Sequence, residues 1–69
     1  MVEWAAYLYA KMRIHGVRWG DVAERLGLHR NYVSHIINGK EHPKNAQQRF
    51  EAAVDEIIAE KATKSADNV

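Results

Sequence analysis

Apolar residues recur every three or four positions along most of the chain, which is the spacing of helices with one buried side. Four stretches show this pattern, and we predict helices over residues 2–15, 19–26, 29–38 and 45–61. Glycine follows each of the first three stretches, and glycine commonly ends helices because it accepts left-handed backbone angles. The pattern predicts a single all-α domain over residues 1–61, followed by a flexible polar tail over residues 62–69.

The last predicted helix has an apolar side formed by Phe50, Val54, Ile57 and Ile58. This side packs against the other helices of the same chain, or part of it faces a second copy and makes the protein a homodimer, and the two arrangements are compatible. The chain has 69 residues and no cysteine. Helix packing or self-association therefore has to stabilise a domain of marginal size.

Residues 19–38 have the spacing of two short helices joined by a tight turn. Ala23 is small where the second helix would cross, Gly27 makes the sharp turn, and Val33 is expected to be buried between the two helices. Four further apolar residues complete the expected internal contacts: Val22, Leu26, Leu28 and Ile36.

The stretch WGDVAERLGLHRNYVSHIINGK resembles the helix-turn-helix of the phage Cro and cI-type repressors, the lambda-repressor-like family. The shared features are the A-x-x-x-G spacing, the apolar residue after the glycine and the terminal I-x-N-G-K. The resemblance covers about residues 8–58 and implies a compact bundle of four or five helices. It also implies a phage- or prophage-encoded transcriptional regulator, in which the second helix of the motif enters the major groove of double-stranded DNA.

By this resemblance, the recognition helix at about residues 29–38 offers four residues to base edges: Arg30, Asn31, Ser34 and His35. Arginine can bond guanine with two hydrogen bonds and asparagine can do the same with adenine, whereas Ser34 has phosphate or sugar as its alternative. The start of the first motif helix and the loop after the recognition helix are expected to contact the DNA backbone. The residues expected there are Arg18, Trp19, Gly20, Tyr32, Lys40, Lys44 and Asn45.

The sequence departs from the family pattern at three positions. Relatives usually place Ser or Thr before the first motif helix and Gln as its first residue, and this chain has Arg18 and Trp19 there. Trp19 either stacks on a sugar, donates its indole N–H to a phosphate, or packs on the hydrophobic core. His29 stands where relatives usually have Ser at the start of the recognition helix, so the residue that caps this helix is left open.

Net charge is +1, but residues 11–44 carry +4 and contain all four histidines. This concentration of positive charge around the motif favours a nucleic-acid partner. The acidic last helix keeps a second hypothesis open, a protein-interaction module of the antitoxin or anti-repressor type. A DNA-architectural or excision role is a third alternative that would use the same helix.

Enzymatic, metal and membrane functions find no support in the sequence. No nucleophile stands beside a His–acid pair, and His29 and His35 are six residues apart, so they point in different directions. We therefore predict no enzyme activity, no cofactor and no metal. No apolar run approaches the ~20 residues of a membrane span, and Glu3 stands where an export signal would be basic. These features predict a soluble protein of the bacterial cytoplasm or nucleoid.

Overall fold

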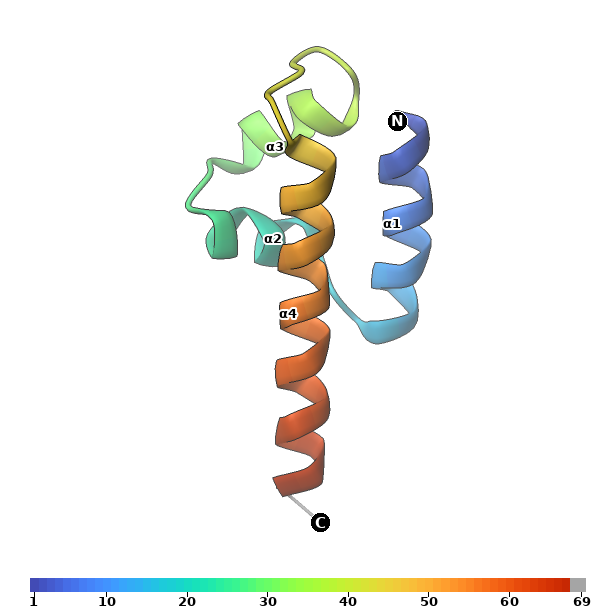
Figure 1. Cartoon of the computed structure of the whole chain (residues 1–69), viewed down its shortest axis with the longest axis vertical. Coiled ribbons are helices and arrows are strands. Elements are labelled where there is room, and N and C mark those ends of the chain that lie inside the picture. Colours follow the sequence, from blue (N-terminus) through green and yellow to red (C-terminus); the bar gives the residue numbers. More distant parts are fainter. Residues whose placement is uncertain (68–69) are drawn as a thin grey trace.

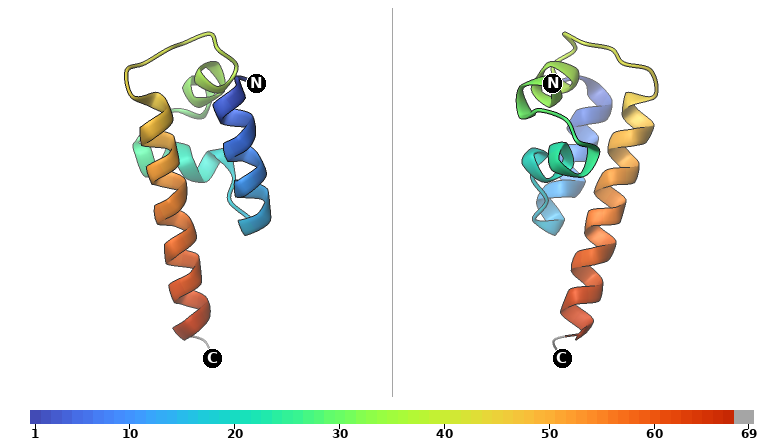
Figure 2. Two further views of the ribbon diagram at one scale, coloured as in Figure 1. Left: turned by 45° about the vertical axis from the view of Figure 1, so that its right-hand side comes forward. Right: turned by 90° about the vertical axis from the view of Figure 1, so that its left-hand side faces the viewer.

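The computed structural model describes residues 1–67 of the chain, and the surroundings of side chains as far as Thr63. Its elements are α1 (Glu3–His15), α2 (Trp19–Leu26), α3 (Arg30–Ile37) and α4 (Ala46–Asp67). The views show α1 and α4 next to each other and running in the same direction, with α2 and α3 on one side of this pair (Figures 1 and 2). The predicted all-α fold is confirmed, with four helices in the described part.

The turn between α2 and α3 has the geometry that the sequence predicts. Gly27 has a φ of 69°, a left-handed conformation that disfavours residues with a side chain. The backbone N–H of Leu28 donates to the carbonyl of Ala23 at 2.8 Å, and that of Gly27 donates to Glu24 at 3.2 Å. These two bonds satisfy carbonyls at the end of α2 and turn the chain sharply into α3.

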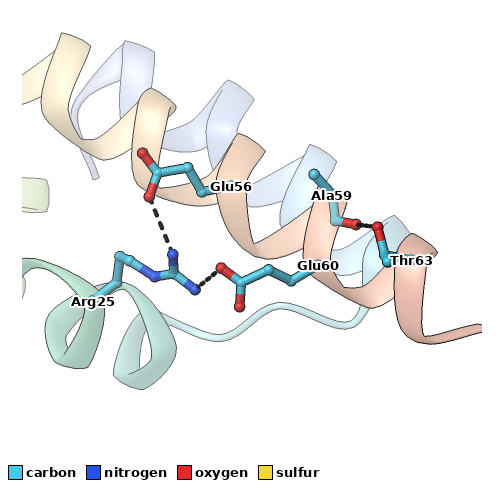
Figure 3. Close-up of polar contacts among 5 residues, drawn as sticks. All are labelled: Arg25, Glu56, Ala59, Glu60 and Thr63. Carbon is cyan, nitrogen blue, oxygen red and sulfur yellow. Dashed lines mark hydrogen bonds and ion pairs between the residues drawn. The ribbon is translucent and has the colours of Figure 1, made fainter.

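α4 is longer than the sequence analysis predicts. The predicted end at Lys61 is wrong, because the helix continues to Asp67. Residues 62–67 are therefore helical rather than an irregular tail, whereas residues 68–69 lie outside the described residues. Neither Gly nor Pro interrupts this segment, its Ala and Lys residues favour helix, and the Thr63 hydroxyl donates to the Ala59 carbonyl at 3.0 Å (Figure 3).

The hydrophobic core takes residues from all four helices and from the loop after α1. Its buried members are Ala5, Leu8, Met12, Val17, Val22, Ala23, Val33, Ile36, Ile37, Phe50, Ala53, Val54 and Ile57. The Trp4 ring packs edge-on against Phe50, with ring centroids 5.5 Å apart. In the motif, Leu26 and Leu28 are only half-buried, although they still pack against this core.

The apolar side of α4 packs inside the chain. Phe50 is 1% exposed, Val54 0% and Ile57 8%, and Ile58 packs half-buried against the same core. Of the two alternatives, packing within the chain is confirmed. A homodimer through some of these residues stays a prediction, and the half-buried Ile58 is the member of the set that is most accessible to a second copy.

Ion pairs join α4 to its two neighbours. Lys11 on α1 lies 2.6 Å from the Asp55 carboxylate, and Arg25 on α2 contacts both Glu56, at 3.1 Å, and Glu60 (Figure 3). The Glu60 carboxylate raises the pKa of Arg25 above its ordinary value, chiefly through their hydrogen bond. These pairs hold cations of α1 and α2 against α4.

Candidate nucleic-acid interface

The α2–α3 motif buries one side of α3 and leaves the other side open. Val33, Ile36 and Ile37 enter the core. The opposite side of α3 consists of exposed residues, most of them polar: Arg30, Asn31, Tyr32, Ser34 and His35. All four residues predicted for base contact are therefore on the accessible side of the helix.

His29 caps the recognition helix. Its Nδ1 accepts a hydrogen bond from the backbone N–H of Asn31 at 3.1 Å, as a side-chain oxygen does at most helix starts. This bond requires the imidazole form whose Nδ1 carries no proton. The sequence analysis leaves the cap open, because histidine is not among the residues preferred at this position.

The start of α2 has only half of the usual reciprocal cap. The Asp21 carboxylate accepts from the backbone N–H of Arg18 at 3.0 Å. The Arg18 side chain has no acceptor atom, so it cannot return a bond to the helix. The first N–H groups of α2 therefore remain available to an anion such as a DNA phosphate.

Arg30 lies against the first turn of α2. A Cβ atom built on Gly20 would lie 3.6 Å from Arg30 Nε and 3.9 Å from its Cζ. The guanidinium group thus lies close to the helix backbone at Gly20, which is half-buried. This contact brings together a residue predicted for base contact and one predicted for backbone contact.

A shallow hollow of about 420 Å³ lies between α2 and α3. Its lining consists of Trp19, His29, Arg30, Asn31, Val33, Ser34 and Ile37. Four of these residues are predicted DNA contacts: Trp19, Arg30, Asn31 and Ser34. The fold therefore brings residues from the start of α2 and the first turns of α3 together around one depression.

Trp19 packs on the core. Its ring stacks on Tyr9, with centroids 6.1 Å apart and planes 13° apart, and lies 6.2 Å from Phe50. Of the alternatives considered for Trp19, core packing is confirmed. Since the residue is only half-buried and also lines the hollow, contact with a DNA sugar or phosphate stays a prediction.

Ser34 is tied to the end of its own helix. The Asn38 side-chain amide donates to the Ser34 carbonyl at 2.9 Å and to its hydroxyl oxygen at 3.3 Å. This pairing orients the Ser34 hydroxyl on the open side of α3. Asn38 is the last residue of the helix predicted over residues 29–38, and its spacing of four residues from Ser34 is the signal that predicts such a contact.

The remaining residues predicted to contact the DNA backbone lie at the two ends of the loop after α3. The backbone N–H of Lys40 donates to the His35 carbonyl at 2.8 Å, which keeps Lys40 at the end of the recognition helix. Lys44 and Asn45 are at the other end of the loop, directly before α4 (Figure 1). Asn45 lines a separate hollow with Trp4 and Pro43 rather than the one between α2 and α3.

Exposed cations on the open side of the motif take part in none of the ion pairs among the described residues. The ion pairs found among the described residues engage Lys11 and Arg25, both of which point toward α4. Arg18, Arg30 and Lys40 are exposed and belong to none of these pairs. A polyanion therefore meets cations whose charge the described part of the chain does not neutralise.

Within residues 1–67, no three His, Asp or Glu side chains lie close enough together to hold a metal ion. None of the four helices is both long enough and apolar enough to cross a membrane.

A comparison with known protein families identifies this motif. A family model described as helix-turn-helix matches residues 8–46, which is more than half of the chain and includes α2, the turn and α3. No curated protein and no solved structure matches the chain.

Proposed function

Because the chain belongs to the Cro/cI-type helix-turn-helix family of DNA-binding regulators, we propose that it regulates transcription by binding specific sequences in double-stranded DNA, with α3 in the major groove. The observation that supports this best is the exposed first turn of α3. It is capped by His29, and its Arg30 side chain lies beside Gly20 in the first turn of α2.

Arg30, Asn31 and His35 read base edges in this proposal, and Ser34 adds a hydroxyl beside them. Arg30 is suited to guanine and Asn31 to adenine, because each can form two hydrogen bonds to its base. His35 follows Ser34 on the exposed side of the helix and can donate or accept one bond.

The DNA backbone is held from both sides of the recognition helix. The free N–H groups at Trp19 and Gly20, with the Arg18 side chain, bind phosphate on one side. Tyr32 and Lys40 bind it near α3, and Lys44 and Asn45 bind it from the far end of the loop. Such contacts orient the protein without reading sequence. Occupying an operator in this way would repress transcription, in the manner of the phage and prophage regulators that the sequence resembles.

In vitro selection from a random DNA pool, followed by fluorescence anisotropy with the selected duplex, tests the proposal. Arg30→Ala and Asn31→Ala are expected to cost about 1–3 kcal/mol of binding free energy each and to relax preference at one base pair. Lys61→Ala serves as the control, because it removes an exposed cation from α4 outside the motif. Wild-type affinity and selectivity in both motif variants would contradict the proposed role of α3.

A protein-interaction module is the second candidate, and the exposed acidic residues of α4 favour it. Glu51, Asp55, Glu56 and Glu60 are all exposed there. Charge substitutions separate the two candidates, because both surfaces are charged and both contacts weaken with salt. Lys40→Ala is expected to weaken DNA binding through the loss of a phosphate contact, whereas Glu51→Gln is expected to weaken only a partner that binds α4.

A further inference from the structure

A groove of about 520 Å³ lies between α1 and α4, and we call it the α1–α4 groove. Its floor is formed by the half-buried Trp4 and the buried Leu8. Its walls are Glu3, Tyr7 and Lys11 on α1 and Gln47, Glu51 and Asp55 on α4. All of these residues belong to α1 or α4, so the groove is separate from the surface proposed to bind DNA.

The two walls have the same spacing. On each helix the three wall residues follow one another at intervals of four, which places them along one side of that helix. The helices run in the same direction (Figures 1 and 2), and Lys11 lies 2.6 Å from Asp55 at one end of the groove. Each wall rises about 12 Å, which is the length of about four residues of extended chain. The groove can therefore hold a short peptide segment.

The groove carries negative charge that the described residues do not neutralise. Lys11 is paired with Asp55. Glu51 accepts a hydrogen bond from the neutral Gln47 amide at 3.0 Å, and both Glu51 and Glu3 lie outside the ion pairs of the described residues. These two carboxylates favour a cationic ligand, whereas the exposed side of α3 favours an anionic one.

Aromatic surface lies between the two carboxylates. The Tyr7 side chain is 74% exposed on the wall of the groove, and an exposed ring face attracts an ammonium or guanidinium group. The Trp4 ring is fixed edge-on against Phe50, with centroids 5.5 Å apart, and its remaining surface lines the groove. This surface suits an apolar side chain that is flanked by basic ones.

We infer that the α1–α4 groove binds a short basic segment of a partner protein. Two Lys or Arg side chains of the segment pair with Glu3 and Glu51, and an apolar side chain between them packs on Trp4 and Leu8. This interaction goes beyond the proposed DNA binding and does not depend on it. A partner held here leaves α3 free, so the chain could bring a second protein to the DNA that it occupies.

Selection from a phage-displayed library of random-sequence peptides, with the full chain immobilised through its carboxyl-terminal side, tests the inference. We expect the selected peptides to share two Lys or Arg residues with an apolar residue between them. Fluorescence anisotropy with a synthetic copy of the most frequent peptide is expected to show an affinity that falls as salt is added. In amide NMR spectra, this peptide is expected to shift the signals of Tyr7 and Glu51 rather than those of α3.

Substitutions on the groove walls should weaken the selected peptide. Glu3→Gln combined with Glu51→Gln is expected to lower its affinity at least about threefold, and Tyr7→Ala at least about twofold. The matched control is Glu24→Gln combined with Glu41→Gln, which changes the net charge equally at two exposed carboxylates outside the groove. The control is expected to leave the affinity unchanged. Circular dichroism melting verifies that the variants fold.

A selection that enriches no basic pattern, equal affinity of the groove and control variants, or NMR shifts centred on α3 would each overturn the inference. A dimer of the free chain whose signals for Tyr7 and Glu51 change on dilution would also overturn it, because a second copy would then occupy the groove. A chain that selects such peptides but no DNA sequence would support the groove and overturn the proposed function.

Discussion

The charged side chains of the α2–α3 motif and of the middle of α4 differ in whether they are paired within the chain. On α4, Asp55, Glu56 and Glu60 receive cations from α1 and α2. On α3, Arg30 is exposed and lies over Gly20, outside the ion pairs of the described residues. Both regions share one core, so the difference concerns charge rather than packing. Charge is paired where the chain meets itself and left accessible where DNA is proposed to bind.

The largest loss of stability is expected from a substitution in the core that both regions share. Phe50→Ala empties a fully buried site that contacts Trp4 and Trp19. We expect a loss of about 3–5 kcal/mol in the free energy of unfolding, enough to unfold most of a domain of this size. Urea denaturation followed by circular dichroism measures it. A stability close to that of the wild type would show that α4 does not pack as described.

The second largest loss of stability is expected at the turn between α2 and α3. Gly27→Ala forces a side chain into a left-handed conformation and should destabilise the domain by about 1–2 kcal/mol. Gly20→Ala is the matched control, because the added Cβ meets Arg30 Nε at an ordinary 3.6 Å inside a helix. We expect it to be neutral or stabilising by up to about 1 kcal/mol. Thermal melts of the two variants should therefore shift in different directions or by clearly different amounts.

Loss of the α3 cap should affect the motif more than α4. His29→Ala removes the acceptor for the Asn31 N–H and is expected to cost about 1 kcal/mol of stability. His29→Asn supplies a side-chain oxygen at the same place and should restore most of it. Hydrogen exchange at the first turn of α3 reports the effect locally. Unchanged exchange in His29→Ala would argue against the cap.

The smallest loss of stability is expected when the carboxylates on α4 that pair with Arg25 are removed. Glu56→Gln combined with Glu60→Gln removes both partners of Arg25. Because these carboxylates are exposed, we expect a loss of less than about 1 kcal/mol, and smaller still at high salt. Chemical denaturation at two salt concentrations measures it. A loss as large as that of Gly27→Ala would show that these ion pairs stabilise α4 more than exposed ion pairs usually do.

The fold and the motif could be predicted because they depend on short-range spacing. Ala23, Gly27 and Val33 occupy positions that only a tight helical turn brings together, and the structure places all three as expected. The exposed side of α3 follows directly, since burying Val33 and Ile36 leaves Arg30 and Asn31 outside.

What escaped prediction depends on long-range packing or on unusual chemistry. Periodicity identifies the apolar side of α4, but it cannot say whether that side meets α1 and α2 or a second copy. The histidine cap was missed because imidazole seldom serves as a helix cap. The extra length of α4 was missed because polar composition resembles that of a tail, although Ala62 and its neighbours have no residue that would stop a helix.

The start of the chain is fastened to the recognition helix. The backbone N–H of Val2 donates to the Ile37 carbonyl at 2.7 Å, and Val2 also touches the site where Gly39 would carry a side chain. An affinity tag or fluorescent protein fused before Met1 would therefore crowd the end of α3. Labels and surface-immobilisation handles belong on the carboxyl-terminal side of the chain, because the described end of α4 at Asp67 lies at the far end of the long axis from this junction (Figure 1).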